Sequence, residues 1–337
     1  MKNNTTTLLQ QIAEQLVTPG KGILAADESE KTICGRFGKR GIPCTEDTRR
    51  AYRELLFCAR GIGQGISGVI LHDETIQQTE RTGILFPDLL HARQILTGIK
   101  VDKGTVPLPN FPEEKITEGL DGLAARLLEY RGMGAVFTKW RGVFTVGKEL
   151  PSLPCIEGNA YLFAEFAAAS QEAGLVPIVE PEVLLLGAHD MKACEYATGR
   201  VLQMVFSSLK KYRVNLSEML LKTSMVLPGD TSGEKSAPEL VALSTIRVLK
   251  AVVPKEVAGI VFLSGGQTPE GATANLNAII RLGVKEKAPW PLSFSFSRAL
   301  QDPVMDKWVG KEENREMAQK IFGGRVAETA RACGGKL

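Results

Sequence analysis

The stretch LVPIVEPE, residues 175–182, combines the two features that decide the fold. Its first five residues are apolar at consecutive positions, so a strand formed here would be buried on both faces, as strands of parallel sheets are. It then ends in two carboxylates, Glu180 and Glu182. Just upstream, the Ala-rich segment 159–173 stops at Gly174, a residue typical of helix C-termini. The unit is therefore a helix followed by a buried strand with a polar end.

This unit recurs along the chain. Eight segments share the strand design, and their starts lie about 31 to 45 residues apart, which is room for one strand, one loop and one helix. The segments are 21–29, 66–74, 97–104, 135–141, 175–182, 219–225, 259–266 and 292–298. Between the third and fourth of them, apolar residues at 120, 123, 124, 127 and 128 have the spacing of an amphipathic helix that ends at Gly132 or Gly134.

Alternating strands and helices imply a parallel sheet covered by helices, and eight such units close a (β/α)8 TIM barrel. We therefore predict an α/β protein with a single (β/α)8 domain over residues 1–337. The surplus length is assigned to an extra N-terminal helix, the long 73–96 connection and a C-terminal helical extension from about 311 to 333. A doubly wound open sheet is the alternative, although the sequence has neither the G-x-G-x-x-G turn nor a Walker loop that would support it.

Composition narrows the function classes. The chain has 337 residues with 41 Lys and Arg against 38 Asp and Glu, and the positive charges are scattered. This argues against nucleic-acid partners and suits small anionic ligands. No stretch is apolar over the roughly 18 residues that a membrane span needs, and the N-terminus lacks a signal core. We expect a cytoplasmic protein with no membrane partner.

Cysteine and histidine usage points away from metal chemistry. The six cysteines lie far apart without a C-x-x-C pair, and the three histidines lack metal-binding spacing. We expect reduced thiols, because disulfides are rare in the cytosol, and no catalytic metal.

The polar ends of the strands predict the site, because all strand C-termini of a parallel barrel meet on one face. The pairs Lys100/Asp102, Lys139/Arg141 and Glu180/Glu182 are each two residues apart, so both members of a pair point the same way along a strand. The alternative is that these charged residues form structural ion pairs with one another in a polar layer of the barrel.

Lys222 is the most informative residue, since it lies within an apolar run from Met219 to Leu227. Burial disfavours the charged form of a lysine, and a nearby cation such as Lys139 would push the same way, which is how a Schiff-base lysine is activated. The alternative is a strand-end lysine that reaches solvent.

Glu180 and Glu182 are two carboxylates whose surroundings could differ enough for one to carry protons while the other stays ionised. Asp27 lies opposite in strand order and could supply a second base. Its alternative role is the N-cap of the following helix.

Ser264, Gly265 and Gly266 follow the seventh strand, where barrels commonly bind phosphate, and Arg298 after the eighth strand could hold the same phosphate. On its own, the S-G-G sequence is as often a plain turn.

The motifs together resemble class I fructose-bisphosphate aldolase over nearly the whole chain. They are GKGILAADES (20–29), GIKVDKG (98–104), KWR (139–141), VPIVEPE (176–182), LLK (220–222) and FLSGGQ (262–267). The resemblance implies a (β/α)8 barrel that reversibly splits fructose 1,6-bisphosphate into dihydroxyacetone phosphate and glyceraldehyde 3-phosphate without a metal or other cofactor. It also suggests a homotetramer.

The resemblance also assigns roles. Lys222 matches the Schiff-base lysine, Glu180 the residue that moves protons during imine formation, and Asp27 the aspartate of C3–C4 cleavage; Lys139 matches the assisting lysine and Glu182 its charge-balancing neighbour. The ketose-side phosphate is assigned to Ser264, Gly265, Gly266, Ser295 and Arg298. The rest of the sugar and its other phosphate are assigned to Ser29, Arg36, Arg49, Lys100 and Arg141, with Thr32 replacing a second small hydroxyl residue.

Two further points qualify the resemblance. Many family members continue into a tail that ends in a tyrosine, whereas this sequence stops at Leu337, so the proton-exchange step on the three-carbon intermediate is open. The competing functions are another imine-forming phosphosugar aldolase, such as a transaldolase, and a phosphosugar-binding scaffold without catalysis. The choice among fructose 1,6-bisphosphate, fructose 1-phosphate and sedoheptulose 1,7-bisphosphate leaves no mark in the sequence.

Overall fold

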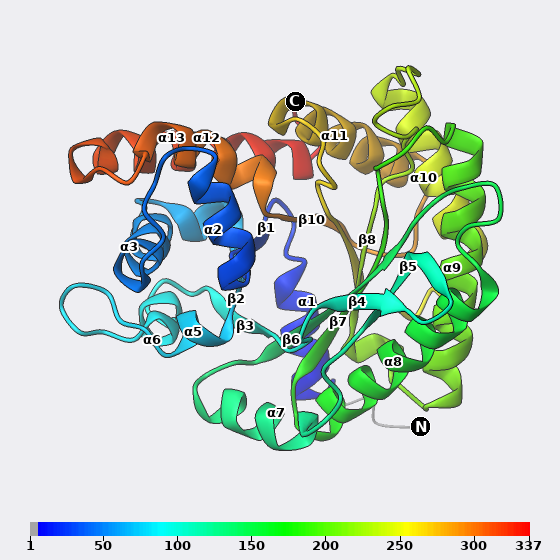
Figure 1. The fold of residues 1–337 in the computed structure, drawn as a ribbon, viewed down its shortest axis with the longest axis horizontal. Helices are drawn as coiled ribbons and strands as arrows, with labels where there is room; N and C mark the ends of the chain where they lie inside the picture. Colours follow the sequence, from blue (N-terminus) through cyan, green and yellow to red (C-terminus); the bar gives the residue numbers. More distant parts are fainter. Residues whose placement is uncertain (1–5) are drawn as a thin grey trace.

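The computed structural model describes residues 6–337, and the eight predicted strands form one closed parallel barrel in it (Figure 1). Around the barrel the order is β1-β10-β9-β8-β7-β6-β3-β2. The strands are β1 (Gly22–Ala25), β2 (Ile66–Leu71), β3 (Leu96–Lys100), β6 (Phe137–Phe144), β7 (Val176–Val183), β8 (Leu220–Thr223), β9 (Gly259–Phe262) and β10 (Leu292–Phe296). Closure confirms the (β/α)8 prediction and excludes the open sheet.

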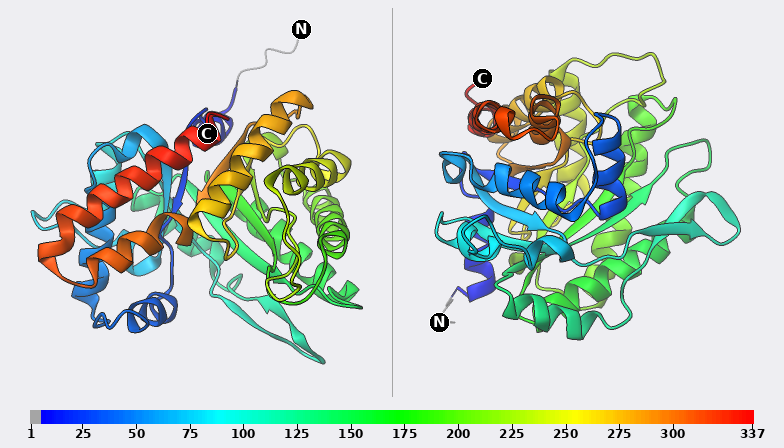
Figure 2. Two further views of the ribbon diagram at one scale, coloured as in Figure 1. Left: turned by 90° about the horizontal axis from the view of Figure 1, so that it is seen from above. Right: turned by 60° about the vertical axis from the view of Figure 1, so that its left-hand side comes forward.

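Helices surround the barrel (Figure 2). They are α1 (Leu8–Leu16), α2 (Glu30–Gly38), α3 (Glu46–Phe57), α4 (Ile62–Gly65), α5 (Asp73–Ile76), α6 (Phe86–His91), α7 (Leu123–Gly132), α8 (Leu153–Glu172), α9 (Met191–Lys211), α10 (Pro238–Val252), α11 (Pro269–Lys285), α12 (Arg298–Trp308) and α13 (Arg315–Cys333), with 3-10 turns η1 (Leu216–Glu218) and η2 (Glu312–Asn314). The expected N-terminal helix is α1. The expected C-terminal extension is α13, which begins a few residues late because η2 precedes it.

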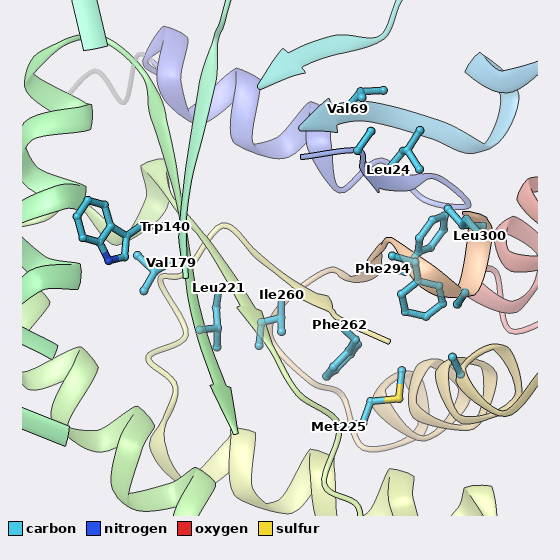
Figure 3. Packing of buried hydrophobic residues seen from close by; sticks show 14 of the residues in the cluster. Leu24, Val69, Trp140, Val179, Leu221, Met225, Ile260, Phe262, Phe294 and Leu300 are labelled. Carbon is cyan, nitrogen blue, oxygen red and sulfur yellow. The ribbon is translucent and has the colours of Figure 1, made fainter. Parts of the chain in front are cut away.

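Alternation along the strands separates two apolar clusters. Outward side chains such as Leu24, Val179 and Leu221 pack against the helices (Figure 3), whereas their neighbours Ile178 and Leu220 belong to a cluster inside the barrel. The inner cluster includes residues of α1, so this helix seals the barrel at the N-terminal ends of the strands. The opposite end, where the strands terminate, is left for polar side chains.

One element was missed by the sequence analysis. The antiparallel hairpin of β4 (Thr105–Leu108) and β5 (Phe111–Thr117) projects from the connection between β3 and β6 (Figure 2). Asn110 in its turn has a φ of +67°, a conformation that asparagine tolerates better than most residues. The Pro-Asn pair at 109–110 between two strand-like runs was the available signal.

The expectation of six reduced thiols is wrong for two of them. Cys34 in α2 and Cys44, just before α3, form a disulfide, with Cα atoms 5.3 Å apart. The cause is local: the chain reverses between the two helices and brings residues ten apart in sequence to bonding distance. The expectation of reduced thiols rested on how rare disulfides are in cytosolic proteins in general, and that frequency does not depend on the distance between two particular cysteines.

Within residues 6–337, no helix is both long enough and apolar enough to cross a bilayer. The same part of the chain contains no group of three or more His, Cys, Asp or Glu side chains arranged to hold a metal ion.

Candidate active site

A cavity of about 1020 Å³ opens at the C-terminal ends of the barrel strands. Of the fifteen site residues predicted from the sequence, all except Arg49 and Gly266 line it. The cavity therefore lies at the polar ends of the strands, as the sequence predicts. Residues from every barrel strand, or from the loop that follows it, line the cavity.

Strand parity explains why the key groups face this cavity. Lys222 is two residues beyond Leu220, and Glu180 two beyond Ile178, both of which point into the barrel. Lys139 stands in the same relation to Phe137, whereas the intervening Trp140 packs outward among the helices. Each polar side chain thus continues the inward row of its strand above the apolar interior.

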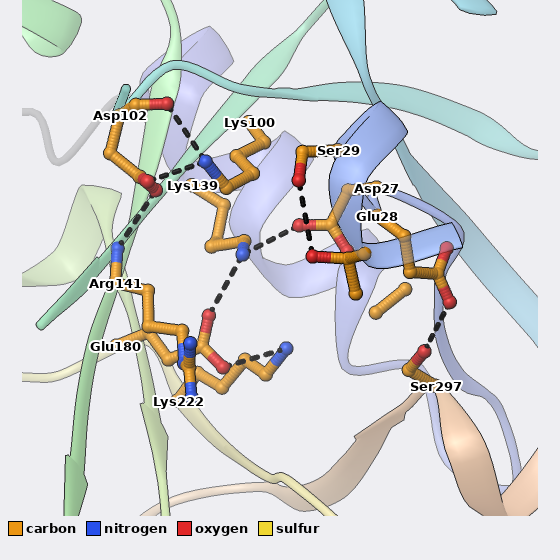
Figure 4. Close-up of polar contacts among 12 residues, drawn as sticks. Asp27, Glu28, Ser29, Lys100, Asp102, Lys139, Arg141, Glu180, Lys222 and Ser297 are labelled. Atoms are coloured by element: carbon orange, nitrogen blue, oxygen red, sulfur yellow. Dashed lines mark hydrogen bonds and ion pairs between the residues drawn. The ribbon is translucent and has the colours of Figure 1, made fainter. Parts of the chain in front are cut away.

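Four of these groups form one continuous chain of ion pairs (Figure 4). The Nζ atom of Lys222 lies 3.1 Å from Oε1 of Glu180, and the other oxygen of Glu180 lies 3.1 Å from Nζ of Lys139. Lys139 also lies 2.5 Å from Oδ2 of Asp27. All four side chains are at most 10% exposed. Two carboxylates and two ammonium groups are therefore balanced in a site shielded from water.

The balance sets the ionisation of the cluster. Burial by itself would raise the pKa of Asp27, but the Lys139 and Lys222 ammonium groups hold it well below its usual range. Glu180 is shifted the same way, since Lys139, Lys222 and Arg141 outweigh the effect of burial on its pKa. Burial would lower the pKa of Lys139, yet Asp27 and Glu180 raise it. Both carboxylates are thus anionic and can accept protons.

The two alternative roles considered for Lys222 and Asp27 do not fit these positions. Lys222 is 3% exposed, so its ammonium group does not reach bulk solvent. The N-cap of α2 is Ser29, and the side chain of Asp27 is directed to Lys139. The hydroxyl of Ser29 lies 3.1 Å from that of Thr32 at the rim of the cavity. Lys222 is therefore placed as a buried amine with a carboxylate at hydrogen-bond distance, the arrangement that amine nucleophiles need.

The loops after β9 and β10 form a cradle suited to phosphate. Gly265 and Gly266 have φ values of +58° and +92°, and among the described residues neither backbone N–H donates to a protein acceptor. The hydroxyl of Ser295 is buried without a hydrogen-bond partner, and Ser264 lines the same wall. Arg298 has no carboxylate partner within residues 6–337, and a Cβ added at Gly266 would lie 3.5 Å from its guanidinium. Free donors and one cation thus converge here.

The cations on the other side of the cavity are already paired. Lys100 lies 2.5 Å from Asp102, and Arg141 pairs with Glu182. These pairs match the structural ion-pair alternative in part, because each cation now has a resident anion. A bound phosphate would share those cations with the carboxylates.

Two arginines of the α2–α3 region are paired as well. Arg36 in α2 pairs with Glu28 and with Asp302, and it lines the cavity. Arg49 in α3 is outside the cavity lining, since its guanidinium is turned to Glu74, 2.5 Å away. The structure thus separates Arg49 from the other predicted substrate residues.

The sequence analysis missed Lys39 as a cavity residue and missed the partners of Glu28. Lys39 lines the cavity with Thr32 and Arg36, and the spacing of these three residues on one face of a helix was a usable signal. The side chain of Glu28 is 6% exposed, pairs with Arg53 and accepts a hydrogen bond from Ser297 at 2.8 Å (Figure 4). No local pattern revealed this contact, because its partners lie far away in sequence.

The chain matches a known protein family over nearly its whole length. Residues 8–337 match a family model described as fructose-bisphosphate aldolase class-I. A probable fructose-bisphosphate aldolase class 1 from Xanthomonas axonopodis pv. citri is 47% identical, over 97% of this chain and 98% of the relative. Cytosolic fructose-bisphosphate aldolase 4 of Arabidopsis thaliana is 49% identical, over 95% of this chain and 81% of the relative.

The fold comparison agrees with the sequence comparison. A solved structure of fructose-bisphosphate aldolase from Plasmodium falciparum, in complex with TRAP and a small molecule inhibitor, matches with a TM-score of 0.95 and 44% identity. The match covers 97% of this chain and 94% of that one.

Proposed function

The chain belongs to the family of class I fructose-bisphosphate aldolases, lyases that reversibly cleave fructose 1,6-bisphosphate through a lysine Schiff base, and we propose that Lys222 is that lysine. The observation that carries the assignment is the contact of 3.1 Å between the Lys222 amine and Glu180 at the buried floor of the cavity. It pairs an amine with the group that can take its proton.

In the first half-reaction, Glu180 accepts a proton from Lys222, and the free amine attacks the ketone carbon of the substrate to form a carbon–nitrogen bond. The ketone oxygen takes up a proton released by the attacking nitrogen and becomes a hydroxyl. The carboxyl of Glu180 then gives its proton to this hydroxyl, which leaves as water. The resulting protonated imine carries the positive charge that the ammonium group of Lys222 carried before. The net charge of the buried cluster is therefore the same before and after imine formation, and Lys139 is again paired with both carboxylates once Glu180 has given up its proton.

In the second half-reaction, Asp27 accepts the proton of the hydroxyl on carbon 4, and the C3–C4 bond breaks. Its electron pair moves into the imine and leaves an enamine on Lys222, while glyceraldehyde 3-phosphate departs. Protonation of the enamine at carbon 3 and hydrolysis of the imine then release dihydroxyacetone phosphate and restore the amine. Asp27 suits the role because its carboxylate is anionic and lines the cavity.

The two phosphates are assigned to opposite sides of Lys222. Ser264, Gly265, Gly266, Ser295 and Arg298 bind the ketose-side phosphate, and the free N–H groups and the unpaired guanidinium support this. Ser29, Arg36, Lys100 and Arg141 bind the remainder of the sugar and its second phosphate. Two clusters favour a bisphosphate, since a monophosphate would leave one of them idle. This also speaks against a transaldolase. The presence of Lys222, Lys139, Glu180 and Asp27 together speaks against a binding scaffold.

The test is to trap the imine. The protein is incubated with dihydroxyacetone phosphate and a chelator, reduced with borohydride, and mapped by peptide mass. The expected result is a single adduct on Lys222. An adduct on another lysine would replace Lys222 in this role, and no adduct at all would revive the scaffold alternative.

We also propose a cytoplasmic location and a homotetramer. The location is supported by the relatives in Arabidopsis thaliana and Cicer arietinum, named cytosolic and cytoplasmic. The assembly is supported by the family resemblance and by exposed apolar side chains on α8, α9 and α10, among them Tyr161, Tyr196 and Leu240. Light scattering coupled to size exclusion tests the assembly, and a monomer at micromolar concentration would refute it.

A further inference from the structure

His72 lies directly across the barrel mouth from Lys222. It is the residue after β2, and in the closed order of eight strands β2 is four positions from β8 in either direction. Its side chain lines the same cavity as Lys222. Neither the sequence motifs nor the mechanism above gives it a role.

Its neighbours place it between two groups with assigned partners. Register pairs Leu71 of β2 with Ile99 of β3, so Lys100 follows alongside His72 on one side. On the other side Ala26 donates to the carbonyl of Ile70, and Asp27 follows. Within residues 6–337, the imidazole makes no hydrogen bond. The ring therefore has free nitrogens at a wall of the substrate cavity.

The surroundings of the ring favour its neutral form. Burial lowers the pKa of His72, and the Lys100 ammonium lowers it further against the opposing effect of Asp27 and Asp73. The charged groups around it also include Arg53 of α3 and Glu74 of α5. A neutral imidazole offers one donor and one acceptor, which suits a hydroxyl group.

The order of groups along the wall matches the order of groups along the substrate. The ketose-side phosphate is assigned to the loops after β9 and β10, next to β8, so carbons 4 to 6 extend across the mouth toward β1, β2 and β3. Asp27 takes the hydroxyl on carbon 4. Lys100 is one of the residues assigned to the remainder of the sugar and its second phosphate, and we place that phosphate beside it. The hydroxyl on carbon 5 lies between these two groups in the substrate, as His72 lies between Asp27 and Lys100 in the protein.

We propose that His72 is a specificity-determining residue that hydrogen-bonds the carbon 5 hydroxyl of the bisphosphate, which is the 2-hydroxyl of the three-carbon aldehyde. The inference rests on the proposed function, because it takes Lys222 as the imine lysine. It assigns the aldehyde side of the cavity a preference for 2-hydroxyaldehydes. A polar group of the substrate that enters this cavity without a partner would lose binding energy.

The experiment compares two aldehydes in the condensation direction. The full-length chain and the His72→Ala variant are given dihydroxyacetone phosphate with either D-glyceraldehyde 3-phosphate or 3-phosphooxypropanal, which lacks only the 2-hydroxyl. We expect His72→Ala to lower kcat/KM about tenfold with the first aldehyde and to leave it unchanged with the second. Equal losses with both aldehydes, or no loss with either, would overturn the proposal.

Two further variants guard against a general structural effect. His72→Gln retains a donor and an acceptor, and it should recover most of the preference for the hydroxylated aldehyde. His91→Ala changes an exposed histidine at the end of α6, outside the cavity, and should leave both rates unchanged. If His72→Ala does not fold, the proposal is tested by His72→Gln against His72→Phe, where only the phenylalanine should abolish the preference.

Borohydride trapping separates this inference from the function on which it rests. His72→Ala should still yield the dihydroxyacetone phosphate adduct on Lys222, because the ketose half does not reach His72. An adduct without a change in aldehyde preference overturns the role of His72 alone. Loss of the adduct from the unchanged protein overturns the imine assignment itself.

Discussion

The strand-borne charges and the helix-borne charges around the cavity are organised differently. Lys222, Glu180, Lys139 and Asp27 lie on or next to barrel strands and form one chain in which each group contacts the next. Arg36 and Arg49 come from α2 and α3, and each is held by carboxylates outside that chain. Strand register therefore fixes the four side chains that we propose to carry the chemistry. The helices supply charge at the rim.

The largest expected effect comes from removing the amine of the strand-borne chain. Lys222→Met should lower kcat for fructose 1,6-bisphosphate cleavage at least 10⁴-fold, because the covalent route is lost. The fold should persist, because the apolar clusters inside and outside the barrel are unchanged. Steady-state kinetics and circular dichroism measure the two outcomes. Lys320→Met, an exposed change on α13, is the matched control and should be neutral. Substantial residual cleavage by Lys222→Met would contradict the proposal that Lys222 forms the Schiff base.

The next effect separates bond cleavage from imine formation. Asp27→Asn should lower kcat for cleavage about 10² to 10⁴-fold, the range for a lost general base, while borohydride still traps dihydroxyacetone phosphate on Lys222. The helix-borne counterpart is Asp302→Asn, which removes a carboxylate from Arg36 at a partly exposed site and should change kcat by less than about threefold. If Asp27→Asn and Asp302→Asn lowered kcat equally, the strand-borne and helix-borne charges would not differ in their importance for cleavage.

The same distinction governs what the sequence could predict. The barrel and the inward positions of Lys139, Glu180 and Lys222 could be predicted because strand period and parallel topology together fix where side chains point. The partners of Arg49 and Glu28 could not, because they depend on how α3 and α12 pack on the barrel. The disulfide and the hairpin were missed for a different reason, since each is created by a local chain reversal.

The third prediction concerns Arg298. Of the arginines predicted to bind phosphate, it is the one that lines the cavity and has no carboxylate partner within residues 6–337. Arg298→Ala should raise the KM for fructose 1,6-bisphosphate about 10 to 100-fold, with a smaller change in kcat, because a charge-assisted hydrogen bond to phosphate is lost. Arg247→Ala, an exposed arginine of α10 paired with Glu195, serves as the control and should leave KM unchanged. An unchanged KM in Arg298→Ala would remove this residue from the site.

A fourth prediction tests the link between α2 and α3. Replacing Cys34 and Cys44 by serine should lower the free energy of unfolding by about 2 to 3 kcal/mol, the value expected when a cross-link over a short loop is removed. Denaturant titration measures the loss. Trapping on Lys222 should be unaffected, because the strand-borne chain does not depend on this loop. Cys58→Ser, which changes a free thiol, should show no such loss. A failure to trap the adduct would mean that the two regions are coupled.

The smallest effect concerns Arg49 and the acid stability of α3. The hydrogen bond from Arg49 lowers the pKa of Glu74 below its ordinary 4.5, so the pair stabilises the fold above about pH 4.5 and loses this contribution as the pH falls through the shifted pKa. Because Glu74 is partly exposed, the contribution should be below about 1 kcal/mol. Thermal unfolding of Arg49→Met and of Glu74→Gln between pH 6 and pH 3 should give the same flattened profile relative to the unchanged protein. The KM of Arg49→Met should change little, because Arg49 does not line the cavity. A rise of tenfold or more would instead place Arg49 among the substrate-binding residues and bring the helical region into the site.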